Sequence, residues 1–203
     1  MILVFGEDSN DTESIKVLVR HLCPRAPGEV VVETRREPPS LTKGATDAKV
    51  RSWMDEIADL VERESRARVV HAVLVHQDSD GPDPSGKVEH RLAAELAAAI
   101  PGHATHAVVP VQMTEAWWLA FPDAVRGVKP TAWRQVKFPR QANTETIAEP
   151  KRELKRITRA ASPKQEYSET DSVAIAEQIV TKKLSLDVDN PSWNRFVAVA
   201  SAL

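Results

Sequence analysis

The sequence predicts an α/β protein, in which helices flank a parallel β-sheet and further helices form a C-terminal layer or subdomain. Two observations favour this class. Up to Thr114, four short apolar segments alternate with three amphipathic helical patterns, which is the order of a parallel sheet with right-handed crossovers. After Thr114 the strand patterns stop and only helical patterns follow. We therefore expect an α/β domain over residues 1–113 and a helical extension packed on it over residues 114–203.

Four segments have the composition of buried strands. Ile2–Phe5 is a continuous apolar run, as expected of a strand that is covered on both faces, and Gly6 ends it. The other three segments are rich in β-branched residues and cover residues 30–32, 69–76 and 106–111. The segment at 69–76 has the strongest pattern, and it breaks into a polar run whose Asp, Gly and Pro content indicates a loop.

Apolar residues at helical spacing predict the helices between these strands. The first helix runs from about residue 11 to residue 22 and closes before Pro24, the second covers residues 47–66, and the third carries Val88, Leu92, Leu96 and Ile100. In the C-terminal part, helical patterns lie near residues 115–121, 150–160, 171–184 and 192–202.

Composition excludes several classes of protein. The 203 residues carry 27 basic and 29 acidic side chains, so the chain lacks the overall basic field typical of nucleic-acid-binding proteins. Binding to a nucleic acid would therefore need a local basic patch or a partner subunit. The single cysteine, Cys23, excludes an internal disulfide and a cysteine zinc site. The apolar start is too short for a signal peptide and no apolar run reaches membrane-spanning length, so we expect a cytoplasmic protein without membrane contact.

Acidic residues follow two of the predicted strands. Glu7 comes after the first strand, and Asp78 and Asp80 come after the third. Ligands of open parallel sheets bind outside the carboxyl ends of the strands, and carboxylate oxygens are the ligands that Mg²⁺ prefers. We therefore expect Glu7, Asp78 and Asp80 to hold Mg²⁺ or Mn²⁺, with Glu7 as the third ligand or as a general acid or base. Three like charges this close need a cation or a proton to neutralise them.

Each acid also has a purely structural interpretation. The run from Asp78 to Gly81 has the composition of an ordinary surface turn, although a second acidic strand end at Glu7 favours a metal site. Asp11 is either the N-cap of the first helix or a ligand of a second metal ion, and the sequence leaves both open. The six histidines show no metal-binding spacing, and His76 is interpreted as a core or strand-end residue.

Two segments resemble the TOPRIM (topoisomerase-primase) domain. Residues 2–11, an apolar strand followed by Glu7, a short turn and an acid that opens a helix, look like its first motif. Residues 74–80, Leu-Val-His-Gln-Asp-Ser-Asp, look like its Asp-x-Asp motif. The chain is similar in this half to TOPRIM nucleases of the overcoming-lysogenization-defect type. The resemblance implies a Mg²⁺-binding fold and nuclease chemistry carried by Glu7, Asp78 and Asp80.

Further segments resemble an uncharacterised TOPRIM-like bacterial family, whose members are often encoded near ATPase or anti-phage defence genes. These segments are residues 114–120, 149–155, 167–169 and 190–196. Glu115 matches the Glu of the family's Glu-Ala-Trp motif, which implies that it joins the metal site; the alternative is an acid at the start of a helix beside a Thr114 cap. The chain departs from the family at Phe121, where an Asp is usual, and at Asp8, where a Gly is usual.

A basic helical face and two tryptophans suggest partners. Lys151, Arg152 and Lys155 repeat at helical spacing together with Arg156 and Arg159, and they are the candidate nucleic-acid contacts. A merely solvated face is the alternative. Trp117 and Trp118 are interpreted as core or interface residues rather than base-stacking groups.

Two functions follow from these features. The first is a Mg²⁺-dependent nuclease, or a related enzyme acting on phosphodiesters, with DNA or RNA as substrate and a role in bacterial anti-phage defence or DNA metabolism. The second is a non-catalytic TOPRIM-like partner or regulator of an ATPase. The modest net charge and an aromatic surface formed by Trp117 and Trp118 would favour the second.

Overall fold

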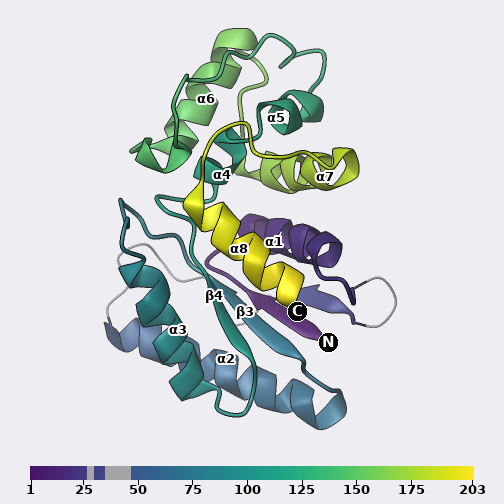
Figure 1. The fold of residues 1–203 in the computed structure, drawn as a ribbon, viewed down its shortest axis with the longest axis vertical. Helices are drawn as coiled ribbons and strands as arrows, with labels where there is room; N and C mark the ends of the chain where they lie inside the picture. Colours follow the sequence, from purple (N-terminus) through teal and green to yellow (C-terminus); the bar gives the residue numbers. More distant parts are fainter. Residues whose placement is uncertain (27–29, 35–46) are drawn as a thin grey trace.

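A parallel sheet of four strands forms the centre of the protein. The computed structural model describes residues 1–26, 30–34 and 47–203. The strands lie in the order β2-β1-β3-β4 and comprise β1 (Ile2–Phe5), β2 (Val32–Thr34), β3 (Ala72–His76) and β4 (Thr105–Val108). The predicted α/β class, with a parallel sheet flanked by helices, is therefore confirmed (Figure 1).

Helices α2 (Asp47–Ala67) and α3 (Lys87–Ala99) cover one face of the sheet (Figure 1). Successive side chains of a strand point to opposite faces, so Leu3 and Phe5 of β1 lie on this side. They share one buried core with β3 and with both helices, which includes Val73, Val75, Trp53, Met54, Ile57, Val61, Leu92 and Leu96. The alternate residues Ile2 and Val4 belong to a second core on the opposite face.

The opposite face is covered by α1 (Ser9–Leu22) and α8 (Pro191–Ala202), and α7 (Ser172–Lys182) packs against α1 (Figure 1). The remaining helices are α4 (Glu115–Leu119), α5 (Pro122–Val128) and α6 (Pro150–Ala161), with 3₁₀ turns at Thr144–Thr146 and Glu169–Asp171. One continuous apolar core runs from the sheet into these C-terminal helices. The helical extension therefore packs directly on the sheet domain.

Trp117 and Trp118 of α4 lie in the middle of this second core, and each is 0% exposed. Trp117 donates its ring N–H to Ser192 Oγ (2.8 Å), and its ring centroid lies 5.1 Å from that of Phe196 in α8. Trp118 donates to Ser172 Oγ (3.1 Å) at the start of α7. The core interpretation is confirmed. The expected aromatic surface is wrong, because both rings are enclosed by the C-terminal helices.

Several predicted strands begin or end at other residues in the structure. The second strand lies at Val32–Thr34 rather than 30–32, the third begins at Ala72, and the fourth ends at Val108. The apolar residues just beyond β4, Val109 and Val111, are buried in the connection to α4 instead of pairing in the sheet. The sequence also missed α5, a short helix that begins at Pro122, a favourable residue for a first helical turn.

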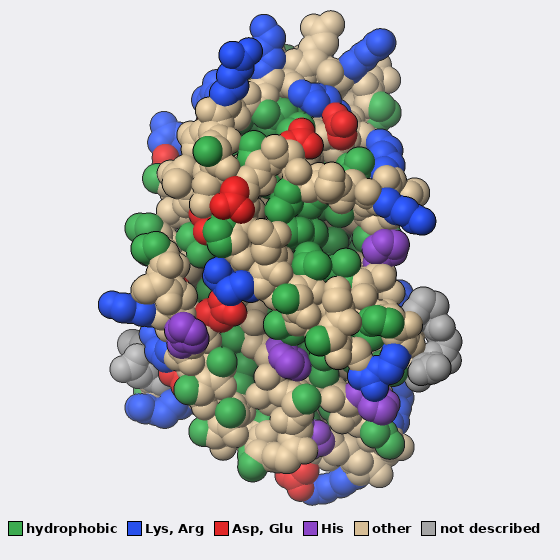
Figure 2. All heavy atoms as spheres, in the orientation of Figure 1, with side chains coloured by type: hydrophobic (Ala, Val, Ile, Leu, Met, Phe, Trp, Pro, Cys, Tyr) green, Lys and Arg blue, Asp and Glu red, His purple; other side chains and the backbone are tan. Residues whose placement is uncertain are grey.

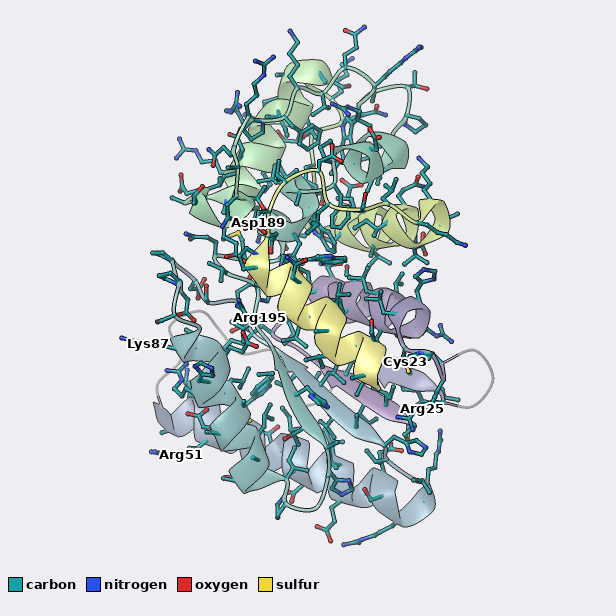
Figure 3. All side chains as sticks on the ribbon, in the orientation of Figure 1. Cys23, Arg25, Arg51, Lys87, Asp189 and Arg195 are labelled. Atoms are coloured by element: carbon teal, nitrogen blue, oxygen red, sulfur yellow. The ribbon has the colours of Figure 1, made fainter. Side chains whose placement is uncertain are left out.

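An ion pair links helices on the two faces of the sheet. Arg195 of α8 (Figure 3) donates to Glu89 of α3 with a distance of 2.6 Å between Nε and Oε2. Among the residues that the structure describes, no helix has the length and apolar character needed to cross a membrane.

Candidate metal centre

The two acidic strand ends meet at the carboxyl edge of the sheet. β1 and β3 are hydrogen-bonded neighbours, with Phe5 opposite Val75, so the residues that follow them emerge side by side. Glu7 Oε2 accepts a hydrogen bond of 3.0 Å from the backbone amide of Asp78. Glu7 therefore faces the Asp-x-Asp loop, as the metal-site prediction requires.

Three side chains form a compact group of potential ligands. Asp11, His76 and Asp78 each offer one ligand atom, and these atoms all lie within 4.8 Å of one another. His76 Nε2 lies 3.3 Å from Asp78 Oδ1 and 3.0 Å from Thr114 Oγ1. The other ring nitrogen, Nδ1, is fully buried and has no hydrogen-bond partner within the described part of the chain. Such unpaired buried nitrogens are uncommon in folded proteins.

Asp11 reaches this group from the first turn of α1. The helix begins at Ser9, and the N-cap is Asp8, whose side chain accepts from the amides of Asn10 (2.7 Å) and Asp11 (2.9 Å). The N-cap interpretation of Asp11 is therefore wrong, and Asp8 has the structural role of capping the helix. Gly6 permits this close approach of helix and strand, because a Cβ there would lie 2.5 Å from Thr12 Oγ1.

The Asp-x-Asp loop places its two acids differently. Asp78 is partly buried and accepts a hydrogen bond from the amide of Thr114 (3.1 Å). Asp80 is exposed, has a left-handed backbone (φ 56°) and donates its amide to the carbonyl of Gln112 (3.0 Å). Asp80 lies outside the compact ligand group, although its charge still acts on Glu7. The second carboxylate of the ligand group is that of Asp11 and not that of Asp80.

Glu115 borders the ligand group from the side of α4. It is 4% exposed, and its Oε1 accepts a hydrogen bond from the Tyr167 hydroxyl (3.1 Å). Lys151 Nζ lies 3.8 Å from the same oxygen and 2.8 Å from Glu169. The Thr114 side chain makes no helix-capping hydrogen bond and instead contacts His76 and Asp78. The structure thus brings Glu115 beside the other acids, together with a lysine that was expected only in the basic face.

Burial and mutual repulsion disfavour ionisation of these acids. The pKa of Glu7 is raised to about 7, chiefly by burial and also by the charges of Asp78 and Asp80, against the lowering effects of His76 and of the hydrogen bond from the Asp78 amide. Burial also raises the pKa of Glu115 to about 7 and shifts that of Asp11 upward. His76 is buried, which favours the neutral ring, but Asp78, Asp11 and Glu7 raise its pKa to about 9. These shifts favour bound protons on the acids in the metal-free protein, and a divalent cation would neutralise the carboxylates in their place.

The donor set fits a small divalent ion. Asp11 and Asp78 offer hard carboxylate oxygens, which suit Mg²⁺ and Mn²⁺. Glu7 lies beside them as a further carboxylate, and the nitrogen offered by His76 is a ligand type that transition metals accept more readily than Mg²⁺ does. The donor set therefore fits Mn²⁺ if His76 is a ligand. It also fits Mg²⁺ if His76 is not a ligand and only orients Asp78.

Replacing Glu7 by glutamine is expected to stabilise the metal-free protein at alkaline pH. Because the pKa of Glu7 is raised from 4.5 to about 7, the folded chain holds a proton that the unfolded chain releases between these pH values. Stability is thus lost as the pH rises through this window. Glutamine keeps an oxygen to accept the Asp78 amide but carries no charge, so we expect a gain of about 1–3 kcal/mol at pH 8.

Urea unfolding in EDTA at pH 8 and at pH 5 measures this effect. The advantage of Glu7→Gln should shrink at pH 5, where the wild-type carboxyl is largely protonated in the folded state. Added Mn²⁺ should stabilise the wild type more than the variant. A variant that is no more stable than the wild type at pH 8 would show that Glu7 carries no such electrostatic cost.

The predicted nucleic-acid contacts all lie on α6, but they differ in their surroundings. Lys151 points to the acidic site, as described above. Arg152 is exposed and pairs with Glu149 (2.7 Å), and Lys155 is partly exposed on the same helix. Lys and Arg side chains gather at the end of the molecule that carries α6 (Figure 2). The basic face is thus a real surface feature, although nearby glutamates partly neutralise it.

Sequence reasoning missed two contributors to the site and misjudged a third. Tyr167 and Thr114 stand in segments that resemble the TOPRIM-like family, but neither was assigned to the site, because hydroxyl groups bind acids in many structural settings. His76 is buried at the end of β3, as interpreted, but it also lies within the ligand group. Its place directly before the Asp-x-Asp loop was the available signal. Comparisons of the chain with protein-family models, with curated proteins and with solved structures found no match.

Proposed function

We propose that this protein is a divalent-metal-dependent nuclease. The observation that carries the proposal is the convergence of Asp11, His76 and Asp78, with Glu7 hydrogen-bonded to the same loop. Glu7, Asp11 and Asp78 come from separate chain segments, and a bound cation would relieve the repulsion among their carboxylates. A metal ion bound by such residues supplies positive charge that activates water and stabilises the charge developing on a phosphodiester. Similarity to TOPRIM nucleases at both acidic motifs supports this reaction.

The surrounding residues have separate tasks in this proposal. Asp11 and Asp78 would hold the ion, with the nitrogen of His76 as ligand or as the group that orients Asp78. Glu7 lies beside them and is placed to accept a proton from the attacking water. Lys151, 37% exposed in its side chain, would contact the phosphate, since its Nζ lies at the rim of the site, 3.8 Å from Glu115 Oε1.

Metal-dependent cleavage of labelled nucleic acids tests the proposal. The purified protein should cleave at least one of four substrates, single- or double-stranded DNA or RNA, in Mn²⁺ or Mg²⁺ and not in EDTA. Calorimetry should detect Mn²⁺ binding to the same preparation. The activity must elute with the protein in size-exclusion chromatography. Absence of both cleavage and Mn²⁺ binding would refute the proposal.

Regulation of an ATPase is the weaker candidate. One of its two supports, an aromatic surface at Trp117 and Trp118, is absent because both residues are buried. An ATPase partner and a role in anti-phage defence remain proposals through the sequence resemblance. A cytoplasmic location remains a proposal from the apolar patterns of the sequence. Mn²⁺ binding without cleavage, together with capture of an ATPase, would favour this candidate.

A further inference from the structure

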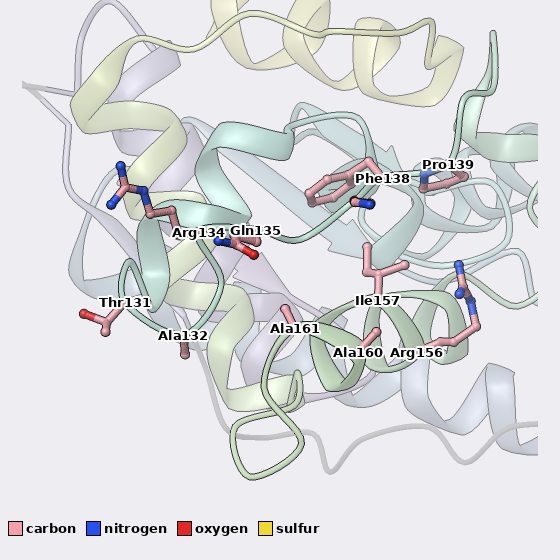
Figure 4. A pocket seen from close by; sticks show the side chains of 11 residues that line it. Thr131, Ala132, Arg134, Gln135, Phe138, Pro139, Arg156, Ile157, Ala160 and Ala161 are labelled. Carbon is pink, nitrogen blue, oxygen red and sulfur yellow. The ribbon is translucent and has the colours of Figure 1, made fainter.

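A basic pocket lies on the side of α6 that faces away from the metal centre. It has a volume of about 680 Å³ and is formed by α6 and the segment from Thr131 to Pro139. Figure 4 shows Phe138 and Pro139 on one side, Ile157 and Ala161 of α6 on the other, and Arg134 and Arg156 at opposite ends. Lys137 also lines it, and no lining residue is acidic. The pocket therefore combines three cations with apolar walls.

The cations of this pocket are available to an anionic ligand. Arg134 and Lys137 are exposed, and neither forms a salt bridge with any residue that the structure describes. Arg156 is held by both carboxylate oxygens of Glu153, each at 2.7 Å. The Arg156 side chain is 65% exposed, so a phosphate can reach the guanidinium from solvent and would share it with Glu153. The pocket thus offers up to three phosphate contacts.

The apolar wall suits a flat ring. Phe138 is partly buried, and the Arg126 guanidinium lies 5.2 Å from its ring centroid. An aromatic ring beside exposed cations is the combination that single-stranded nucleic acids use, because a base stacks on the ring while the cations bind the backbone. A duplex fits this arrangement less well, since its bases already stack on one another.

Basic side chains of α6 lie between the pocket and the metal centre, and three of them, Arg152, Arg156 and Arg159, also pair with glutamates. A second cavity of about 450 Å³ adjoins it and shares Arg156 and Ala160 with it, and its other lining residues are Arg152, Lys155 and Arg159. An α-helix turns about 100° per residue, so the basic residues of α6 lie within about 140° of its circumference in the order Lys151, Lys155, Arg159, Arg152, Arg156. Lys151 is at the acidic site, and Arg156 is at the pocket, about 7.5 Å further along the helix axis.

We propose that this pocket binds one unreacted nucleotide of a single-stranded nucleic acid, whose backbone crosses the basic face of α6 to reach the metal centre. The interpretation of the bound strand as a substrate rests on the proposed nuclease function. Phe138 would stack on the base, and Arg134, Lys137 and Arg156 would bind the adjacent phosphates. The pocket would then set where along a strand cleavage occurs.

Binding of a fluorescein-labelled single-stranded DNA in EDTA, followed by anisotropy, tests the pocket without any cleavage. The double variant Arg134→Gln/Lys137→Gln should raise the Kd about tenfold, because two phosphate contacts are lost. Phe138→Leu keeps an apolar side chain and should raise the Kd about fivefold to tenfold for the single strand, with little effect on a blunt duplex. Circular dichroism confirms that each variant is folded.

The matched control is Arg51→Gln/Lys87→Gln, which removes the same charge from α2 and α3, far from α6 (Figure 3). It should change the Kd by no more than about twofold. Equal loss in the control, or wild-type binding by both pocket variants, would overturn the assignment. Tighter binding of a poly-glutamate peptide than of DNA would also overturn the assignment, because the ligand of the pocket would then be an acidic protein segment. If the pocket variants lose binding while the wild type never cleaves, the pocket assignment stands and the nuclease proposal fails.

Discussion

Asp78→Asn is expected to reduce metal-dependent cleavage by at least about 1000-fold. Asp78 belongs to the compact ligand group and contacts His76, Thr114 and, through its amide, Glu7. Charge stabilisation by a metal ion is worth several kcal/mol in the transition state, and each 1.36 kcal/mol corresponds to a factor of ten in rate. Removing a charged ligand should remove most of this contribution.

The substitution should leave the fold intact. Asparagine keeps a side-chain oxygen that can accept the Thr114 amide, now 3.1 Å from Asp78 Oδ1. It removes one of several repelling charges but also the carboxylate that faces His76, so the two effects on stability oppose each other. Cleavage of the labelled substrate and calorimetric Mn²⁺ binding should both decline, while circular dichroism of the metal-free protein keeps the native spectrum.

Asp123→Asn is the matched control for this experiment. Asp123 is an exposed carboxylate on α5 that pairs with Arg126 at 3.0 Å, and it makes no contact with the ligand group. The same chemical change there should leave cleavage within about twofold of the wild type. Equal activity of the Asp78 and Asp123 variants would mean that the ligand group is not the reaction centre.

Trp117→Ala is expected to destabilise the protein by about 3–5 kcal/mol, the usual cost of deleting a buried aromatic side chain. The ring is 0% exposed, stacks on Phe196 and meets Trp193 edge-on with centroids 5.3 Å apart. Its loss would leave a cavity between α4 and α8 and remove one hydrogen bond to Ser192, whose hydroxyl keeps its bond to Asn190 (3.0 Å). Because one core joins the sheet to the C-terminal helices, both regions should unfold together.

Urea unfolding followed by circular dichroism measures this cost. Val69→Ala, at a side chain that is 70% exposed, is the control for loss of apolar volume and should change the free energy of unfolding by less than about 0.5 kcal/mol. A Trp117→Ala variant that loses less than about 1 kcal/mol would contradict the central place assigned to this ring. The Trp117→Ala variant should also bind Mn²⁺ more weakly. Trp117 packs α4 in place, and the same helix carries Glu115 and begins after Thr114, which both border the ligand group.

The sequence by itself determined the class of fold. Alternation of apolar strands with amphipathic helices specifies a parallel sheet, since each crossover helix must bury its apolar stripe on one sheet face. The buried strand β1 was predicted with its correct limits, Ile2–Phe5. Strand ends elsewhere were misplaced, because apolar residues such as Val109 and Val111 are equally suited to a buried connection. Such residues give no local sign of whether they pair in a sheet.

The membership of the ligand group was decided only by the tertiary structure. The sequence places Glu7 and Asp78 after strands, and parallel pairing of β1 with β3 is enough to bring them together. Choosing Asp11 and His76 over Asp80 depends on side-chain direction. Asp8 caps α1 and turns Asp11 inward, His76 ends β3 on its buried side, and the left-handed backbone of Asp80 turns that residue outward. These directions arise from packing between distant segments, so no local pattern encodes them.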